Sequence, residues 1–212
     1  MTNRIEIVGL LGAGKTTLLN KIALQKCSNV CCVFEELSPL NEVWNLIRET
    51  NQNYYLLQSS YYLESFNKIQ NATSDRLIIS DFSLNVHHFV YSFHLLQKNL
   101  LNQVEWNVLN KMLKLFSANL PVITGIILID ATESELLENL HQRNRNLDSK
   151  TSLDYLNNLV DCFKVNKIKI LENVPTLTVS TSELRDFNQI TEQKLNDFIE
   201  VSQIEARLLR KP

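Results

Sequence analysis

Residues 9–18 have the sequence GLLGAGKTTL and hold three of the four glycines in the chain. Before them, residues 4–8 form a short apolar run that predicts a buried strand, and residues 15–26 carry leucine and isoleucine at helical spacing. Gly9, Gly14, Lys15 and Thr16 match the phosphate-binding pattern G-x-x-x-x-G-K-[ST] at the strand-to-helix junction that the pattern requires. The alternative is an incidental glycine turn at the start of a helix. We disfavour it, because such a turn would not require the lysine and threonine that complete the pattern.

Each residue type in this loop has a physical reason. Glycine permits left-handed torsions that turn successive backbone N–H groups inward, and these groups hold a polyphosphate together with the positive end of the next helix. Lys15 would reach the β and γ phosphates, and the Thr16 hydroxyl would bind Mg²⁺. The loop therefore predicts a nucleoside triphosphate with Mg²⁺. The predicted cofactor-binding residues are Gly9, Gly12, Ala13, Gly14, Lys15, Thr16 and Thr17.

Strand-like and helix-like segments alternate along the rest of the chain. Strands are predicted at residues 4–8, 30–34, 77–80, 126–129 and 177–179, and helices at residues 15–26, 41–50, 54–70, 89–101, 106–116, 132–141, from 151 onward and at 191–209. Thr132 and Glu135 form a capping-box pattern, and Thr151 and Asp154 repeat a similar signal. The alternation predicts βαβ crossovers and a parallel sheet covered by helices on both faces, in one α/β domain over residues 1–212.

Composition limits the class of protein. The 212 residues are 44% hydrophobic and 21% charged with a net charge of −2, which is ordinary for a globular domain and argues against a strongly basic nucleic-acid binder. No apolar run approaches the roughly 18 residues of a membrane span, and residues 2–8 resemble a strand rather than a signal peptide. Without metal-ligand spacing, the four cysteines predict free thiols in a reducing cytoplasm. They are Cys27, Cys31, Cys32 and Cys162.

Acidic residues follow three of the predicted strands. Glu35 could accept a proton from an attacking hydroxyl, although Glu35 and Glu36 could equally be a solvated surface pair. Asp81 could hold Mg²⁺ directly or through water, or it could cap a helix. For Asp130 we favour a helix cap.

Arg143 and Arg145 close the helix that follows the fourth strand. Two arginines in a lid segment, residues 143–150, could fold over the γ phosphate and neutralise charge on the transferring group. Arginines near a helix C-terminus also suit the helix dipole, which leaves a structural role open.

In this order, these pieces resemble the deoxynucleoside kinase family. The stretches that carry the resemblance are GLLGAGKTTL (9–18), VFEELSPLNEVW (33–44), YYLLQSSYYLESF (54–66), LIISDFSLNVHHFV (77–90), the segment from Ile126 to Leu159, and VPTLTVSTSELRDF (174–187). Apart from the phosphate loop each motif is weak alone, and their order and spacing carry the argument.

The resemblance implies a parallel five-stranded sheet in three layers, the P-loop kinase fold. It also implies transfer of the ATP γ-phosphoryl group to the 5′-hydroxyl of a deoxynucleoside, often by a dimer. Glu35 matches the general base of the family and Gln58 matches the glutamine that contacts the base edge. Asp81 matches the acid of the D/E-R-S motif, and Arg143 and Arg145 match the lid arginines.

The chain departs from the family pattern on the acceptor side. Phe82 stands where the D/E-R-S motif has arginine, and Glu36 stands where a proline follows the general base. His87 replaces an acid that helps to recognise the base, and Lys164 aligns approximately with a glutamate that holds the sugar 3′-hydroxyl. His87 and His88 are adjacent, so on a helix they point about 100° apart and do not chelate one ion.

These observations leave three hypotheses. The first is a kinase that phosphorylates the 5′-hydroxyl of a nucleoside, with Glu35, Lys15, Arg143 and Arg145 as catalytic residues. Its predicted substrate-binding residues are Gln58, Asp81 and His87, and its metal-binding residues are Thr16 and Asp81. The second is a kinase for a more anionic or non-nucleoside acceptor, suggested by Lys164. The third is a weakly active nucleotide-binding subunit or pseudokinase, suggested by Phe82. The expected assembly is a homodimer or a heterodimer, with no nucleic acid and no membrane.

Overall fold

The computed structural model describes residues 3–25, 29–35, 47, 50, 52–72, 76–143, 152–171 and 173–208. Five parallel strands form one sheet in the order β2-β3-β1-β4-β5. The strands are β1 (Asn3–Val8), β2 (Val30–Val33), β3 (Leu77–Ser80), β4 (Val122–Asp130) and β5 (Thr176–Ser180). This confirms the predicted α/β class and the parallel five-stranded sheet.

β1 lies at the centre of the sheet because its apolar side chains are buried on both faces. All six of its residues are buried, and it pairs with β3 on one side and β4 on the other. Arg4 and Glu6 are also buried there, and they form an ion pair with a 2.8 Å N–O distance. Pairing within the strand lets two charges lie inside the sheet.

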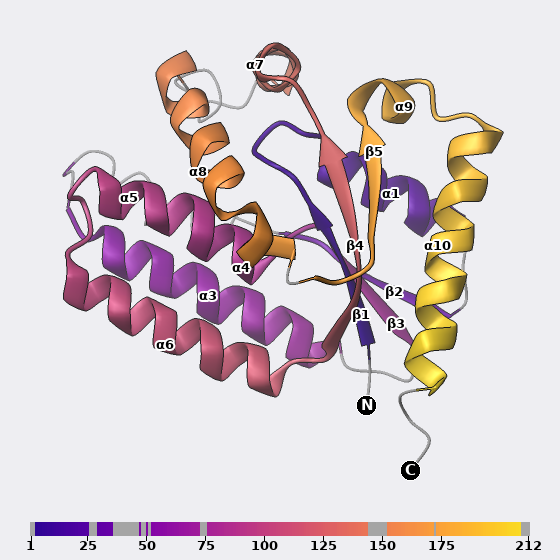
Figure 1. The fold of residues 1–212 in the computed structure, drawn as a ribbon, viewed down its shortest axis with the longest axis horizontal. Coiled ribbons are helices and arrows are strands. Elements are labelled where there is room, and N and C mark those ends of the chain that lie inside the picture. Colours follow the sequence, from indigo (N-terminus) through magenta and orange to yellow (C-terminus); the bar gives the residue numbers. More distant parts are fainter. Residues whose placement is uncertain are drawn as a thin grey trace.

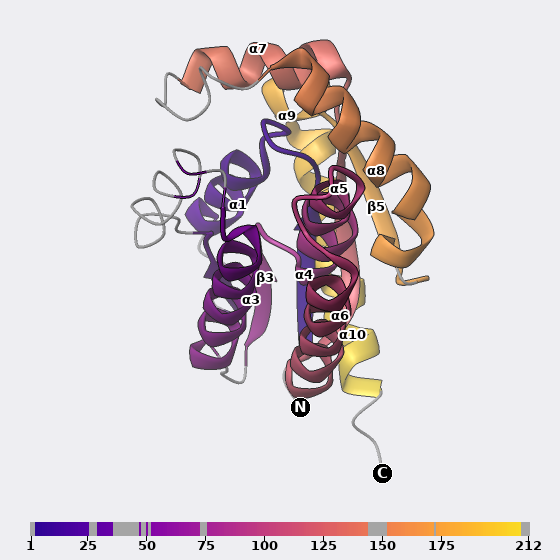
Figure 2. The ribbon, with the colours of Figure 1, turned by 90° about the vertical axis from the view of Figure 1, so that its left-hand side faces the viewer.

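Helices cover both faces, which gives the three layers seen in Figures 1 and 2. One face is covered mainly by α1 (Lys15–Leu24) and α10 (Gln189–Leu208). The other carries α3 (Tyr54–Asn71), α4 (Leu84–Val86), the π-helical turn η2 (His87–Ser92), α5 (Phe93–Gln97), α6 (Gln103–Asn119) and α8 (Leu153–Leu171). Two apolar clusters fill the space between these layers, one around β1 and β4 and the other around α3 and α6. Of the helices in the described ranges, none is long and apolar enough to cross a membrane.

Two short elements stand at the carboxyl edge of the sheet, beside the loop that follows β1. They are α7 (Glu133–Arg143) and α9 (Thr181–Arg185), and both lie at the top of Figure 1. Since ligands bind where parallel strands end, α7 and α9 border the region where a site is expected.

Most predicted elements are present with shifted ends, one differs clearly in its bounds, one short helix was missed, and one predicted helix is not tested. The helix predicted at 89–101 is wrong in its bounds, because helical structure begins at Leu84 and passes through η2 before α5 ends at Gln97. The short helix α9 was not predicted. The helix predicted at 41–50 lies outside the described residues except at Ile47 and Thr50.

The predicted free thiols agree with the structure where it describes them. Cys31 and Cys32 are half-buried in β2, Cys162 is buried in α8, and none of the three forms a disulfide bond. Cys27 lies outside the described residues.

Candidate active site

The loop after β1 has the backbone that a phosphate-binding loop needs. Gly12 and Gly14 have φ angles of 85° and 96°, in the left-handed region that glycine adopts without strain. A Cβ atom on Gly12 would also lie 2.7 Å from the carbonyl oxygen of Leu136 in α7. Lys15 Nζ donates a hydrogen bond to the Leu10 carbonyl at 3.1 Å, which holds the ammonium group over the loop.

Asp81 connects the ends of three neighbouring strands. Its Oδ1 accepts a 2.6 Å hydrogen bond from the backbone N–H of Glu35, after β2, and its carboxylate also accepts one from the Thr16 hydroxyl, after β1. Asp81 does not cap the following helix, because Ser83 Oγ accepts the hydrogen bond from Val86 N at the start of α4. The alternative reading of Asp81 as a helix cap is therefore wrong.

The remaining oxygen of Asp81 suits a cation. Asp81 is fully buried, its Oδ2 atom has no hydrogen-bond partner, and burial raises the pKa of its carboxyl against the lowering effect of its hydrogen bonds. A positive ion at this oxygen would remove that cost. In the described residues, no group of three or more His, Cys, Asp or Glu side chains is placed to hold a metal ion. The Asp81 carboxylate and the Thr16 hydroxyl are oxygen ligands of the kind that Mg²⁺ takes together with phosphates and water.

The Glu35 carboxylate faces the same region. Its Oε1 atom is 3.2 Å from His87 Nε2, and 27% of the side chain is exposed. Burial would raise the pKa of Glu35, but the hydrogen bond and charge of His87 and the charges of Lys15 and Lys68 lower it below its ordinary value of 4.5. Glu35 is therefore a carboxylate at neutral pH, paired with His87 and only partly exposed. Glu36, the other member of the solvated-pair alternative, lies outside the described residues.

Aromatic rings surround His87. Tyr61 from α3 stacks on it with ring centroids 4.9 Å apart, and Tyr91 from η2 lies at 5.7 Å. Burial raises the pKa of the Tyr91 hydroxyl, which also bonds to the backbone of Leu11 in the phosphate loop. Tyr91 thus joins the loop to the Glu35 region. Tyr91 was not among the predicted site residues, because no motif of the sequence includes it.

Gln58 lies in the second turn of α3, which begins at Tyr54, and its side chain is buried, with 3% exposed. Its Oε1 atom accepts a 2.8 Å hydrogen bond from Ser92 Oγ in η2. The same turn η2 also carries His87, which pairs with Glu35. Through η2 the structure therefore connects the three predicted acceptor-side residues, Glu35, Gln58 and His87.

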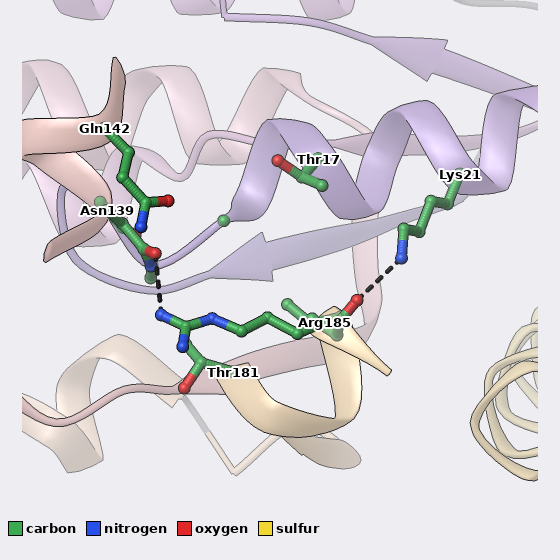
Figure 3. Close-up of a pocket in the computed structure, with 10 residues that line it drawn as sticks. Thr17, Lys21, Asn139, Gln142, Thr181 and Arg185 are labelled. Atoms are coloured by element: carbon green, nitrogen blue, oxygen red, sulfur yellow. Dashed lines mark hydrogen bonds between the residues drawn. The ribbon is translucent and has the colours of Figure 1, made fainter. Parts of the chain in front are cut away.

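A cavity of about 370 Å³ lies on the other side of the phosphate loop, between that loop, α7 and α9. Figure 3 shows side chains from all three elements around it. Its lining residues are Gly12, Ala13, Gly14, Thr17, Lys21, Asn139, Gln142, Thr181, Leu184 and Arg185. Only the phosphate-loop members of this set were predicted, because the others come from α1, α7 and α9 without a motif of their own.

Side-chain hydrogen bonds tie the walls of this cavity together. Asn139 in α7 donates to the carbonyl of Gly12 at 2.8 Å and accepts from Arg185 of α9 at 3.2 Å. Lys21 donates to the Leu184 carbonyl at 2.7 Å (Figure 3). The phosphate loop is therefore held between α7 and α9.

The caps and the lid differ in part from prediction. Thr132 and Glu135 form the predicted reciprocal hydrogen bonds at the start of α7, whereas Asp130 is exposed at the end of β4, so the prediction of Asp130 as the cap is wrong. In α8 the cap is Ser152, whose Oγ accepts from Tyr155 N, and Thr151 lies outside the described residues.

The arginine predictions concern a segment that is described only in part. Arg143 is the last residue of α7, and Arg145 and the predicted lid residues 144–150 lie outside the described residues.

Two departures from the family pattern have clear positions. Phe82 is 2% exposed and packs in the apolar cluster around α3 and α6. The side chain of Lys164 is 67% exposed and pairs with Glu133 of α7 at 3.6 Å. Lys164 is therefore directed to α7 at the surface and is not brought to Glu35 or Gln58.

Comparison with known proteins places this arrangement in a family. The family model described as deoxynucleoside kinase matches residues 5–204. The chain belongs to the deoxynucleoside kinase family. It is 27% identical over 195 residues to deoxyadenosine kinase of Dictyostelium discoideum, a match that covers 89% of this chain and 76% of the relative. It is 25% identical over 186 residues to deoxyguanosine kinase of Bacillus subtilis (strain 168), covering 86% and 88%.

Family membership confirms the resemblance that the motifs indicated, and the described sheet and its helices agree with the P-loop kinase fold of the family. The two relatives have different bases in their names, and both are distant in sequence. The deoxynucleoside kinase family therefore gives the class of chemistry, and the choice of base has to be argued from the site.

Proposed function

We propose that this chain is an ATP-dependent phosphotransferase that phosphorylates the 5′-hydroxyl of a nucleoside or deoxynucleoside. The observation that supports it most is the Glu35 carboxylate, which is ionised and lies beside Asp81 and the phosphate loop. A carboxylate at this place can remove the proton of an acceptor alcohol while the donor phosphates rest on the loop.

Each protein group then has a role in direct phosphoryl transfer. Glu35 accepts the proton of the 5′-hydroxyl, which becomes the nucleophile. The amides of the phosphate loop and Lys15 hold the phosphates in line, so that positioning and charge neutralisation supply most of the rate. Mg²⁺ held by Thr16 and Asp81 would neutralise charge on the phosphates. Arg143 and Arg145 are proposed to close over the γ phosphate.

The acceptor would lie against the side chains of α3 and η2. In this proposal Gln58 contacts the base edge, and the rings of Tyr61, His87 and Tyr91 supply an aromatic wall. On the donor side, the cavity of about 370 Å³ beyond Gly12 and Gly14 is of a size to take the base of the triphosphate.

The decisive experiment is a nucleoside panel with labelled ATP and Mg²⁺, compared between the parent and two variants. Glu35→Gln should lower kcat by about 100-fold or more, because the proton acceptor is lost. Lys15→Ala should lower it by a similar amount through loss of a charged donor at the phosphates. Glu200→Gln and Lys111→Ala make the same changes at exposed positions of α10 and α6 and should leave the rate unchanged.

A second candidate function has one observation in its favour. Phe82 places a buried ring where the family motif has a cation, so a donor to the reacting oxygens is missing. Such a chain would bind Mg·ATP and serve as a weakly active subunit or pseudokinase. Binding of ATP without turnover of any nucleoside, in a sample whose Glu35→Gln variant behaves like the parent, would favour this second function.

A further inference from the structure

The π-helical turn η2 presents two pairs of side chains to different surroundings. His87 and Tyr91 lie on the side of Glu35, whereas His88 and Ser92 both lie near the hydroxyl of Tyr62 in α3. Residues spaced by four lie on the same face of a helical segment. The turn therefore places one pair beside the general base and the other beside Tyr62.

The second pair belongs to a chain of buried hydrogen bonds that ends at Gln58. His88 Nδ1 is 2.7 Å from the Tyr62 hydroxyl, which is 3.5 Å from Ser92 Oγ, and Ser92 Oγ donates to Gln58 Oε1 at 2.8 Å. We refer to His88, Tyr62 and Ser92 as the Ser92 relay. All three are fully buried. Buried, connected hydrogen bonds hold their members in one arrangement.

Packing fixes the far end of the Ser92 relay. The His88 ring stacks on Trp106 of α6, with centroids 4.1 Å apart and an interplanar angle of 20°. Burial raises the pKa of Tyr62 above its ordinary value, so its hydroxyl keeps its proton. The His88 ring and the Tyr62 hydroxyl are therefore held in place, and they limit the movement of Ser92.

A glutamine amide has an acceptor oxygen at one end and a donor nitrogen at the other, and a half-turn exchanges them. The Ser92 proton is shared with Oε1, which makes the end of the amide at η2 the oxygen end. A turned amide would place its nitrogen against Ser92 Oγ, so Ser92 would have to accept that hydrogen bond. Its own proton would then exchange an acceptor at 2.8 Å for the Tyr62 hydroxyl at 3.5 Å. The Ser92 relay therefore favours the orientation that directs the donor end of Gln58 away from η2.

We propose that the Ser92 relay fixes the orientation of the Gln58 amide and thereby makes the site discriminate between amino and oxo groups on the edge of the base. This inference rests on the proposed function, in which Gln58 contacts that edge. Ser92 is accordingly a positioning residue for specificity and does not itself touch the substrate.

The chemistry of purine bases gives the consequence. The edge of adenine pairs a ring-nitrogen acceptor with an amino donor, and the edge of hypoxanthine has a ring N–H donor with an oxo acceptor. A fixed amide matches both groups of one base and meets the other donor to donor and acceptor to acceptor. Because unmatched buried polar groups are costly, we expect a preference of about tenfold or more between the two bases.

The experiment compares deoxyadenosine with deoxyinosine, which differ only on this edge. The kcat/KM of each is measured for the parent and Ser92→Ala, and the Kd of each nucleoside is measured by calorimetry without ATP. The parent should prefer one nucleoside by about tenfold or more, and Ser92→Ala should move both ratios at least about fivefold toward one. Tyr62→Phe should shift the ratios in the same direction by less.

The control is Ser59→Ala, because the Ser59 hydroxyl is one residue from Gln58 but bonds to the Tyr55 carbonyl within α3. It should keep the parental ratios. Equal affinities in the parent, or an unchanged ratio in a folded Ser92→Ala protein, would overturn the proposal. If Ser92→Ala does not fold, Ser92→Cys keeps the size with a weak donor and serves in its place. If the parent binds the two nucleosides with unequal affinity but phosphorylates neither, the proposed function is rejected. The role of Ser92 is then still tested by the ratio of the two Kd values in the parent and in Ser92→Ala.

Discussion

At position 82 the chain exchanges a cation of the family motif for a ring that belongs to the hydrophobic core. Phe82 is 2% exposed and shares its cluster with Tyr61 and Leu57 of α3, the helix that also carries Gln58. The position therefore supports the acceptor wall by packing. A charge cannot simply be restored there, because the surrounding side chains are apolar.

We expect Phe82→Arg to unfold the protein more easily rather than to raise its activity. A guanidinium without a buried partner, together with the lost ring, should lower the free energy of unfolding by about 3 kcal/mol or more. Thermal denaturation of parent and variant measures this loss. Phe82→Leu keeps an apolar side chain and should lose much less. An unchanged melting temperature in Phe82→Arg would mean that the arginine reaches the site.

His87 lies where the family has an acid, and it should set the acid limb of the pH–rate profile. Glu35 has a lowered pKa because His87 and two lysines outweigh burial, so the base stays ionised as the pH falls toward 4.5. His87→Gln removes the charge of His87, while an amide donor and the burial remain. The pKa of Glu35 should then rise, and the acid limb of kcat/KM should move to higher pH.

The matched control for this change is His94→Gln, because His94 is also buried but packs against Tyr155. Its profile should follow that of the parent. A His87→Gln profile that also coincides with the parental one would show that the pair with Glu35 does not govern the base.

Single residues could be predicted where the strand pattern placed them at a common edge. Glu35 and Asp81 each follow a short apolar strand, and their backbone-to-carboxylate hydrogen bond confirms that the two lie together. Tyr91 and Ser92 could not be found in this way. Both lie in the π-helical turn η2 and not at a strand end, and no motif of the sequence includes either of them.

At the scale of elements, short segments were the hardest to predict. The helix predicted at 89–101 missed its true start, because Ser83 caps the chain directly after β3 and the next residues pass through η2. No apolar period develops over three residues of α4 or five of α9. Both short elements nevertheless border the candidate site, so the least predictable parts of the fold are those that shape it.

The contacts between α7 and the phosphate loop predict a role for Asn139 in holding the donor nucleotide. Asn139 joins the Gly12 carbonyl to Arg185 of α9. Asn139→Ala removes both hydrogen bonds, so the phosphate loop is no longer tied to α9 through α7. The loss should raise the KM for ATP about threefold to tenfold. Steady-state kinetics at saturating nucleoside measures it. His141→Ala, on the exposed side of α7, should leave the KM unchanged, and an equal effect of both changes would refute the role of this contact.

At the scale of the whole molecule, the order of the strands explains why the site residues meet. β2, β3 and β1 are neighbours, so Glu35, Asp81 and the phosphate loop follow adjacent strand ends. The sequence predicted the parallel sheet through its alternating pattern, but the pairing of β1 with β3 and β4 joins segments far apart in the chain. Such pairings leave no local pattern, and the order of the strands was not predicted.

The stability of the whole fold should depend on pH through His88. Burial lowers its pKa from 6.5 to about 4, because the charged ring would have no water. Below pH 6.5 the unfolded chain binds a proton at this ring that the folded chain does not bind, so stability falls with decreasing pH and continues to fall until about pH 4. The full loss from this one group is at most about 3 kcal/mol.

Urea denaturation at several pH values from about 4 to 7 measures this dependence. His88→Gln lacks the titrating ring, so its free energy of unfolding should be lower at pH 7, where the hydrogen bond to Tyr62 is missing, yet fall less steeply with acid. The slope distinguishes titration from packing, because a merely structural loss lowers the curve at every pH. His141→Gln, at an exposed position, should retain the parental slope. A His88→Gln slope equal to that of the parent would place the acid sensitivity in other groups, such as His94, whose pKa burial also lowers.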